Sequence, residues 1–530
     1  MKPPALAAHD PSSSEINTLI KNRLLSTSGQ PDPVDGPKMV EQRDKEDSDE
    51  GRCQRTSFNI PSMMITDECS IGRLTIDMLS DDVLLYIFDL YRQELKDVHN
   101  IWPWHALIHV CQRWRHVIFA WPHHLDLQLD CRSGIGVAKA LDIWPANLLI
   151  NIRSDLDLEN GDDIVAALGH RDRIAGIEMT CTTMLQLERC TAVMQEPFPL
   201  LRTLSFRYFK NDHGAPVVLG AFLGGSAPRL QKITLWCVPF PTLPELLLST
   251  KDLVELNLDK ITSAGYISPD ALATSLSMLK GLEHIGVSFQ SFKSFPSLTN
   301  RPPPPLIRAV LPALKTFVFR GISKYSEDLI ARIDAPLLLY FSLQFFYQPI
   351  FDIPQVPQFL CCVEKFKSPL TADIDFFKYT IVVSLFSLGC NFFLRFHCTG
   401  FNEQLLLLKQ ICTQFFPHTT HVHHLKLNRE YTFGPGREDS ALWLGFFRPF
   451  NAVQVLDVIG DKLGVDIACV LGGLTAGRAA EALPMLHTVV LHGPEQTNPL
   501  VTRLSRLFID ARKLSDHPVA ISWIPQLMRS

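Results

Sequence analysis

A short pattern of apolar residues recurs along most of the chain and limits its possible folds more than any other feature. Each copy reads apolar-x-x-apolar-x-apolar, as in Leu-Arg-Thr-Leu-Ser-Phe at 201–206 and Leu-Val-Glu-Leu-Asn-Leu at 253–258. This alternation predicts short strands, each with one buried face and one exposed face. The clear copies begin at Ile174, Leu201, Leu230, Leu253, Leu282, Leu314, Leu338, Val422, Val453 and Leu486.

The segments between these strands are predicted to be helices. Residues 268–279 show this best, because Ser268 is suited to cap a helix and Pro269 to occupy its first position. A strand and a helix in every ~20–29 residues is the signature of leucine-rich repeats, which stack because one repeat cannot bury its apolar face alone. We therefore expect an α/β fold in which residues 122–530 form an irregular leucine-rich-repeat-like solenoid. Further helices are expected at 162–168, 403–415 and 502–513.

The repeat is irregular in two respects. The spacing between successive copies, with weaker ones included, varies from roughly 23 to 33 residues, and the Asn or Cys that usually follows the last leucine is missing. Four weaker copies, at Pro122, Asn147, Val363 and Asn391, are needed to complete the period. A sandwich of unrelated strands and helices therefore remains an alternative to the solenoid.

The first part of the chain differs from the rest in composition. Residues 1–70 contain a serine run at 12–14, a Pro- and Gly-containing stretch at 29–37, and a run of charged residues at 41–50. Such a segment cannot bury enough apolar surface to offset the entropy lost on folding. We predict that residues 1–70 are a disordered N-terminal tail.

Residues 74–121 are predicted to form a small helical module. A first helix is expected over 79–90, with Ser80 as N-cap and Asp81 and Asp82 in the first turn, where the helix dipole favours anions. A second helix is expected over 104–118. Two helices of this length are too small to form an adequate core, so their remaining apolar surface needs a partner.

The same segment resembles the F-box. The F-box pattern runs Leu-Pro-x-Glu-hydrophobic-Leu, Ile-Phe and Val-Cys-[RK]-x-Trp-Arg, and here the matching stretches are 79–84, 87–88 and 110–115. With Trp-Pro at 121–122 and again at 144–145, the chain looks like the F-box family of mushroom-forming fungi. The sequence departs from the pattern where Ser80 replaces proline, Asp82 replaces glutamate and Gln112 replaces a basic residue.

The resemblance implies a substrate-receptor subunit of an SCF-type (Skp–cullin–F-box) ubiquitin ligase. Such a subunit binds a Skp-type adaptor, and through it a cullin, while its repeat domain holds a target protein. The alternative is a non-ligase protein-interaction scaffold, in which the helical pair only caps the solenoid. The residues that the resemblance assigns to adaptor binding are Leu79, Val83, Leu84, Ile87, Phe88, Leu107, Val110, Cys111 and Trp114.

The target-binding surface is predicted from strand geometry. Alternate residues of each strand face the concave side of a solenoid, and one of them lies just after the third apolar position of each copy. This series mixes both signs of charge and includes a tryptophan, which favours a protein partner over nucleic acid. The residues predicted to contact a target are Arg207, Trp236, Asp259, Arg320 and Gln344.

Charge and motifs argue against several other classes of protein. The net charge is −5, from 50 Lys and Arg against 55 Asp and Glu, which gives no reason to expect nucleic acid or an anionic membrane as partner. Residues 379–394 are uncharged but shorter than the roughly 20 residues of a membrane span, so we expect them in the core. Because no GxSxG, HExxH or phosphate-binding glycine motif occurs, we expect neither an enzyme nor a cofactor.

Cysteine and histidine residues give two further expectations. The 13 cysteines include no CxxC pair and the N-terminus lacks a secretory signal, so reduced thiols in the cytosol or nucleus are expected. His421 and His423 would share a strand face and could in principle bind zinc, but no cysteine or carboxylate stands at ligand spacing. We expect no metal site.

Overall fold

The computed structural model describes residues 76–94, 105–122, 128–132, 141, 144–155, 162–209, 222–296, 308–348, 351–415, 419–429, 440–474, 482–492, 499–514 and 516–524. The chain divides into two compact units, Met1–Leu74 and Thr75–Ser530, and every described residue belongs to the second. The predicted tail at 1–70 lies outside the described residues.

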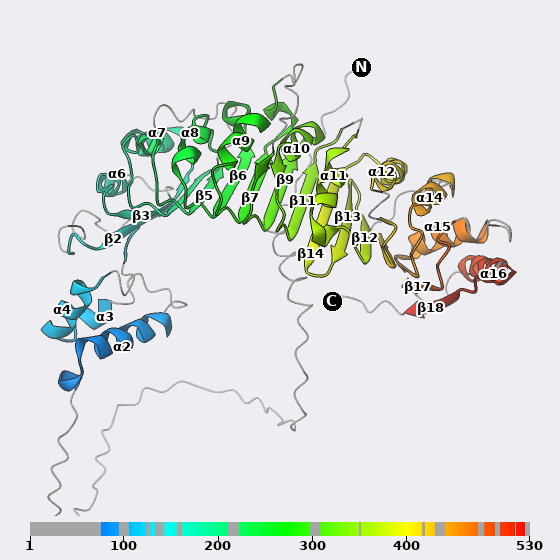
Figure 1. The fold of residues 1–530 in the computed structure, drawn as a ribbon, viewed down its shortest axis with the longest axis horizontal. Helices are drawn as coiled ribbons and strands as arrows, with labels where there is room; N and C mark the ends of the chain where they lie inside the picture. The colour runs from blue at the N-terminus through cyan, green and yellow to red at the C-terminus, as the bar shows by residue number, and fades with distance from the viewer. Residues whose placement is uncertain are drawn as a thin grey trace, which may run out of the picture. The chain divides into compact units, whose positions relative to one another are not determined.

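Sixteen strands form one large sheet in a mixed α/β fold (Figure 1). Neighbouring strands are parallel except at the two sides of β13, where the pairing is antiparallel. In sheet order, the strands are β1 Gln128–Arg132, β2 Leu149–Asp155, β3 Ile174–Cys181, β4 Thr203–Tyr208, β5 Lys232–Trp236, β6 Glu255–Ile261, β7 His284–Phe289, β9 Thr316–Gly321, β11 Tyr340–Phe345, β14 Cys390–His397, β13 Thr380–Ser387, β12 Thr371–Phe376, β15 His424–Arg429, β16 Val455–Ile459, β17 Thr488–His492 and β18 Ala520–Ile524. Strands β8 Ala309–Val310 and β10 Ile333–Asp334 form a separate pair.

The strands predicted from the clear copies of the pattern are confirmed, and nearly all of them start the same number of residues after the pattern begins. All the clear copies of the pattern fall on strands. With the exception of the copy at Ile174, each copy begins two residues before its strand. For example, Leu201 lies two residues before the start of β4, and Leu253 two residues before the start of β6. The first apolar residue packs in the turn that enters the strand, and the next two point into the core. Leu253, Leu256 and Leu258 are all buried in this way.

Helices follow most strands and cover one face of the sheet, as α6 to α10 show in Figure 1. Alternate strand residues are buried against them, while those between are half-exposed, as in β7 and β11. We call the uncovered side the open face. The helices are α6 Asp162–Leu168, α7 Met184–Val193, α8 Leu243–Ser249, α9 Pro269–Leu276, α10 Ser323–Ile330, α11 Gln355–Cys362, α12 Phe401–Gln414, α14 Ser440–Phe447, α15 Asp461–Gly472 and α16 Pro499–Leu514.

Several of the predicted helices are confirmed in detail. α6 matches 162–168, and α12 and α16 cover the expected 403–415 and 502–513 with shifted ends. α9 has Pro269 in its first turn, and the Ser268 hydroxyl accepts a hydrogen bond of 3.2 Å from the Ala271 N–H. These ends are set by local chemistry, which is why the sequence predicts them.

The middle of the sheet departs from the predicted repeat. β12, β13 and β14 form an antiparallel meander, so β14 and not β12 lies beside β11. The weak copy at Val363 is wrong, because this residue lies between two helical segments and the next strand starts at Thr371. The copy at Asn147 is confirmed by β2, and the copy at Asn391 lies inside β14. The residues directly after Pro122 lie outside the described part of the chain.

The uncharged stretch 379–394 is part of this meander. It supplies β13 and the first half of β14, and most of its apolar side chains are buried, as predicted. Within the described ranges, none of the helices is both long and apolar enough to cross a membrane.

In its described part, the helical module contains three short helices in place of the predicted two. α2 spans Asp81–Glu94, α3 His105–Ile108 and α4 Gln112–Ala120. The single helix predicted over 104–118 is wrong, because Cys111 adopts an extended conformation and caps α4 through its Sγ, which accepts from the Trp114 N–H at 3.5 Å. Arg115 bonds the carbonyl of Ile108 across the break, at 3.1 Å. In α2, Ser80 caps the helix as predicted, with its hydroxyl 3.4 Å from the Val83 nitrogen.

Candidate functional site

The residues predicted to contact a target lie in one row across the open face. Arg207 of β4 pairs with Trp236 of β5, and Trp236 pairs with Asp259 of β6. Further along the sheet, Arg320 of β9 pairs with Gln344 of β11. The register therefore brings the five predicted side chains to the same edge of the strands, near their carboxyl ends.

The part of this row from β4 to β9 concentrates charge and aromatic surface. The Lys260 ammonium lies 4.4 Å from the centre of the Trp236 ring, and Phe209 packs on the same ring at 4.5 Å. Burial raises the pKa of Asp259 above its usual value, and the nearby Arg320, Lys260 and Arg207 partly oppose this rise. Three cations thus act on one half-buried carboxylate.

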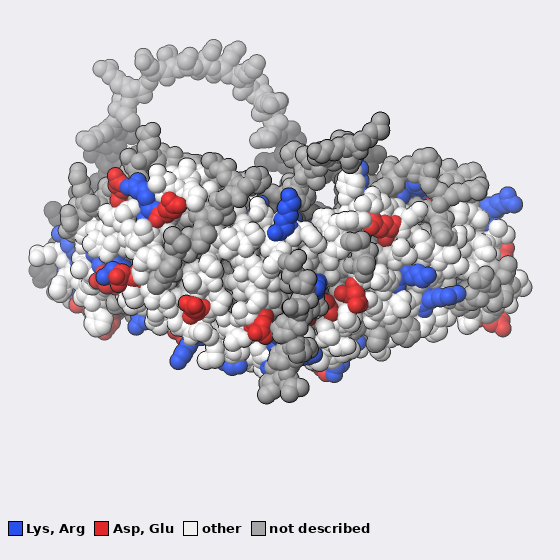
Figure 2. Space-filling model, turned by 90° about the horizontal axis from the view of Figure 1, so that it is seen from above, with Lys and Arg blue, Asp and Glu red and all other residues white. Residues whose placement is uncertain are grey.

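Elsewhere the surface charge is mixed. On the side seen in Figure 2, the described Lys and Arg residues occur in small groups among Asp and Glu, and most of the other described surface is neutral. Ion pairs between neighbouring strands have the same mixed character, as in Lys232 with Glu255 at 2.8 Å.

The C-terminal part of the open face carries a different polar group. Asp457 of β16 lies between His492 of β17, at 2.7 Å, and His424 of β15, at 3.8 Å. Burial acts to raise the pKa of Asp457, but the contact with His424 and the neighbouring His492 and Lys426 outweigh it, so the pKa is lowered. The described residues contain no cluster with metal-binding geometry. His421 and His423 are exposed and precede β15, so they do not form the predicted strand pair.

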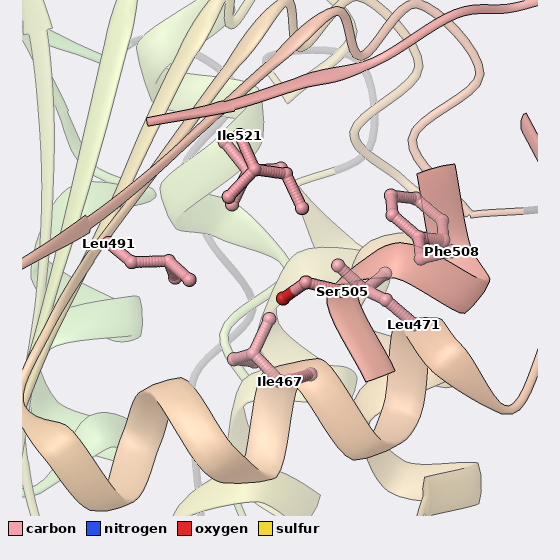
Figure 3. A pocket seen from close by; sticks show the side chains of 8 residues that line it. Ile467, Leu471, Leu491, Ser505, Phe508 and Ile521 are labelled. Atoms are coloured by element: carbon pink, nitrogen blue, oxygen red, sulfur yellow. The ribbon is translucent and has the colours of Figure 1, made fainter. Parts of the chain in front are cut away.

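A small cavity lies between α15, α16 and the last strands. Its walls are almost entirely apolar, with Ser505 as the polar exception (Figure 3). A volume of about 10 Å³ leaves room for no more than one water molecule. We interpret the cavity as a packing defect and not as a ligand site.

In the helical module, three of the residues assigned to adaptor binding belong to its own core. Leu84, Phe88 and Leu107 are buried, with Phe88 only 1% exposed. The Phe88 ring packs on the Trp114 ring at 4.8 Å between centroids. Trp114 itself, like Leu79 and Cys111, is half-buried. A partner could reach these three residues in part, but it could not reach Phe88 without opening the module.

The opposite side of α2 is apolar and exposed. Val83, Tyr86, Ile87 and Leu90 are 43%, 65%, 37% and 44% exposed. Their spacing of i, i+3, i+4 and i+7 places them on one face of the helix. We call these four residues the α2 stripe. Val110, which is also exposed, adds to the apolar surface of the module.

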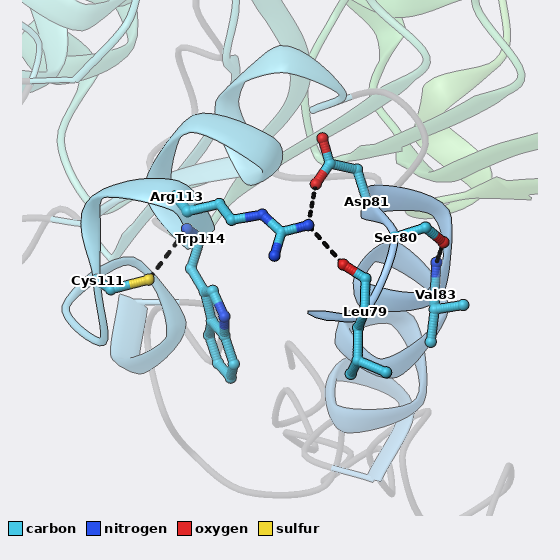
Figure 4. A network of polar contacts seen from close by, with 7 residues as sticks. All are labelled: Leu79, Ser80, Asp81, Val83, Cys111, Arg113 and Trp114. Carbon is cyan, nitrogen blue, oxygen red and sulfur yellow. Dashed lines mark hydrogen bonds and ion pairs between the residues drawn. The ribbon is translucent and has the colours of Figure 1, made fainter. Parts of the chain in front are cut away.

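A polar clamp fixes the start of α2 against α4 (Figure 4). The Arg113 guanidinium donates to the Leu79 carbonyl at 2.5 Å and to the Asp81 carboxylate at 2.8 Å. Arg113 is thus a positioning residue for α2. Because Asp81 stands in the first turn of α2, these bonds fix the N-terminal end of α2, where the α2 stripe begins, relative to α4.

The module also contacts the segment that follows it. Val117 and Ile118 of α4 are buried in the continuous apolar core of this unit. The Asn147 side chain donates to the Phe119 carbonyl at 3.0 Å, and the Phe119 and Trp144 rings lie 6.1 Å apart. These contacts are what a module that caps the first strands would make.

Sequence reasoning missed Tyr86, Leu90 and Lys260. Tyr86 and Leu90 carry a detectable signal, because they complete an i, i+3, i+4, i+7 series with two residues that were already candidates. Lys260 gives no such signal, since simple alternation places it on the opposite side of β6 from Asp259.

Comparison with known proteins does not identify a family for this chain. No protein-family model matches the sequence, and no curated protein matches it. Among solved structures, the leucine-rich repeat-containing protein LegL7 from Legionella pneumophila is 10% identical, with 72% of this chain and 97% of that chain covered and a TM-score of 0.24. So low a score carries no argument, and the assignment of a leucine-rich-repeat-like solenoid rests on the parallel register of the strands and the helices that follow them.

Proposed function

We propose that this chain is a substrate-receptor subunit of an SCF-type ubiquitin ligase. In this proposal the helical module binds a Skp-type adaptor, and through it a cullin, while the open face of the sheet holds a target protein. The observation that carries the proposal is the α2 stripe, an exposed apolar helix face whose opposite side is already packed in the module's core. The F-box resemblance of the same segment names the partner.

An exposed helix stripe of this kind fits a known mode of recognition. An amphipathic helix lays apolar residues at i, i+3, i+4 and i+7 into a groove of its partner. Covering one Val, Leu or Ile side chain contributes roughly 1.5–3 kcal/mol relative to leaving it in water. Because the four side chains of the stripe are 37–65% exposed, covering each one contributes roughly half of this, so the stripe supplies part of the free energy of binding and the rest of the interface must offset the cost of association.

The target side rests on the composition of the open face. Its half-buried residues combine Trp, Arg, Asp and Gln, which are suited to hydrogen bonds and aromatic contacts with another protein. The proposal includes no catalytic residue, cofactor or metal, and it places the chain in the cytosol or nucleus with the rest of the ubiquitin machinery. Membrane and nucleic acid are not partners in this proposal.

The test uses the full chain and a purified fungal Skp-type adaptor. In the Leu90→Asp variant a charge replaces a member of the α2 stripe, and we expect adaptor affinity to fall at least tenfold by calorimetry. The matched control is Leu406→Asp in α12, because both leucines are exposed, at 44% and 56%, in helices of 14 residues. Unchanged affinity in Leu90→Asp, or an equal loss in Leu406→Asp, would reject the stripe as the docking surface.

The alternative is an interaction scaffold in which the module only caps the solenoid. The contacts of Asn147 and Trp144 with Phe119 favour it, since they join the module to the first strands. A pure cap predicts that the wild-type chain captures no adaptor at any concentration tested. It also predicts that Leu90→Asp leaves every binding property of the chain unchanged.

A further inference from the structure

Strand β6 contains an irregularity that changes which side chains reach the open face. The register of its pairing with β7 shifts between Leu258 and Ile261, because β6 has one more residue than β7 in this interval. Within this bulge Lys260 has a φ of 52°, a left-handed conformation that a lysine rarely adopts. A β-bulge re-aims side chains, and here Lys260 joins Asp259 on the side of Trp236.

Strain at a residue that is not glycine points to a use for its side chain. A glycine at this position would adopt the same backbone conformation without steric cost. Such strain persists where the surrounding structure enforces it, and it gathers at functional sites. Cys237, which follows Trp236 as Lys260 follows Asp259, has a φ of 58°, so the strain is shared with the preceding repeat and what is particular to β6 is the lysine side chain. It adds a second cation beside Arg207 on the same part of the face.

The aromatic side chains supply a flat apolar surface next to these cations. Phe209 is half-exposed and packs on Trp236, with an angle of 42° between the rings. Trp236 is covered on part of its surface by the Lys260 ammonium. A ligand on this surface can therefore place an apolar group on the rings and a negative group beside the ammonium at the same time.

The cations come from strands that are spread along a line, although all three also act on the carboxylate of Asp259. Arg207 and Arg320 stand on β4 and β9, which are four strand spacings apart in the sheet, or about 19 Å. Lys260 stands on β6, midway between them. An extended peptide of about six residues has this length. Three cations act on the carboxylate of Asp259, so positive charge predominates among these four side chains.

We propose that Arg207, Trp236, Lys260 and Arg320 bind an extended acidic segment of the target protein, with several Asp or Glu residues and one large apolar side chain. This names the target chemistry of the open face and rests on the proposed function. The span from β4 to β9 favours carboxylates distributed along a peptide over a single phosphate group, which would cover only part of this length. The central Asp259 disfavours a nucleic-acid backbone, whose charges are continuous.

The experiment measures binding of fluorescent ten-residue peptides to the full chain by anisotropy. The first peptide carries alternating Glu residues and one Leu, the second has Gln for every Glu, and the third has one phosphoserine among Gln residues. We expect the acidic peptide alone to bind, with an affinity that falls as salt is raised. The proposal would be overturned if the Gln peptide bound as well as the acidic peptide or if the phosphopeptide bound more strongly. It would also be overturned if single-stranded oligo-uridine bound and the acidic peptide did not.

Variants at Lys260 separate the charge from the fold. Lys260→Gly removes the ammonium and relieves the backbone strain, so we expect at least a tenfold loss of acidic-peptide affinity with an unfolding midpoint that is the same or higher. Lys260→Arg should retain binding. The matched control is Lys426→Ala, which removes a cation from β15 on the same face and should leave affinity unchanged. Equal losses in Lys260→Gly and Lys426→Ala would show only a general charge effect and refute the site.

This result is independent of the adaptor. Failure of peptide binding with intact adaptor binding would remove the acidic-segment proposal and leave the ligase proposal standing. The reverse outcome would keep the peptide site on a protein that is not a ligase subunit.

Discussion

A buried carboxylate on the helical side of the solenoid makes stability depend on pH. Glu327 of α10 accepts hydrogen bonds from the backbone N–H groups of Gln355 at 2.7 Å and Val356 at 3.2 Å. α11 begins with Pro354, which offers no side-chain cap, so the preceding repeat caps it instead. Glu327 is only 6% exposed. Burial is the main cause that raises its pKa from 4.5 to about 7, against the opposing effect of the two N–H donors.

The sign of the effect follows from the direction of this shift. The folded chain holds the proton at pH values where the unfolded chain has lost it, so the contribution to stability is complete below pH 4.5 and is lost as pH rises through about 7. The shift corresponds to roughly 3 kcal/mol of unfolding free energy. In the Glu327→Gln variant this dependence disappears, but one N–H loses its acceptor at a cost of about 1–3 kcal/mol. The wild type should therefore be the more stable at pH 5, and its advantage should shrink or reverse by pH 8.

The assay is urea unfolding of both proteins at half-unit steps between pH 5 and pH 8. The matched control is Glu403→Gln at the start of α12. The Glu403 carboxylate also accepts a hydrogen bond from a backbone N–H, that of Thr399, but it is only partly buried. This variant therefore measures the effect of removing a carboxylate charge that is not deeply buried. Parallel stability profiles for the wild type and Glu327→Gln across this range would refute the reasoning.

Three further predictions concern single side chains. Tyr325→Phe leaves the Ile267 carbonyl without its 2.9 Å donor and should cost about 1–2 kcal/mol in urea unfolding. Phe508→Ala enlarges the cavity beside α15 and should cost about 3–5 kcal/mol by the same assay; a loss below 1 kcal/mol would mean that the region is not packed as described. Arg113→Ala breaks the contact with Asp81 and should cost about 1 kcal/mol or less, while hydrogen exchange in the first turn of α2 becomes faster.

The repeat could be predicted because each strand is specified by its own residues. Apolar residues such as Leu253 and Leu256 recur in the apolar-x-x-apolar-x-apolar pattern, which helices do not show. The pattern therefore predicts both the position of the strand and the residues on its buried face. The row from Arg207 to Asp259 follows directly, because parallel strands with the same frame pair in the same register. Ser268 and Ser80 predict helix starts for the same local reason.

Three features could not be predicted because they depend on tertiary structure. The strands of the β12–β14 meander look like ordinary strands in sequence, and only their pairing reveals that β13 runs the other way. The sequence spacing shows that Leu90 shares a face with Val83, but whether this face or the face of Phe88 is buried depends on which side of α2 meets α4, and both sides are apolar. The bulge at Lys260 depends on a register shift with β7, which no pattern within β6 encodes.

The most direct test of the central claim is hydrogen exchange of the full chain with and without a saturating purified Skp-type adaptor. We predict that amides of α2 between residues 83 and 94 exchange more slowly in the complex, while strands β4 to β9 stay unchanged and remain able to bind a target. Unaltered exchange throughout α2, or protection confined to the open face of the sheet, would contradict adaptor docking through this helix.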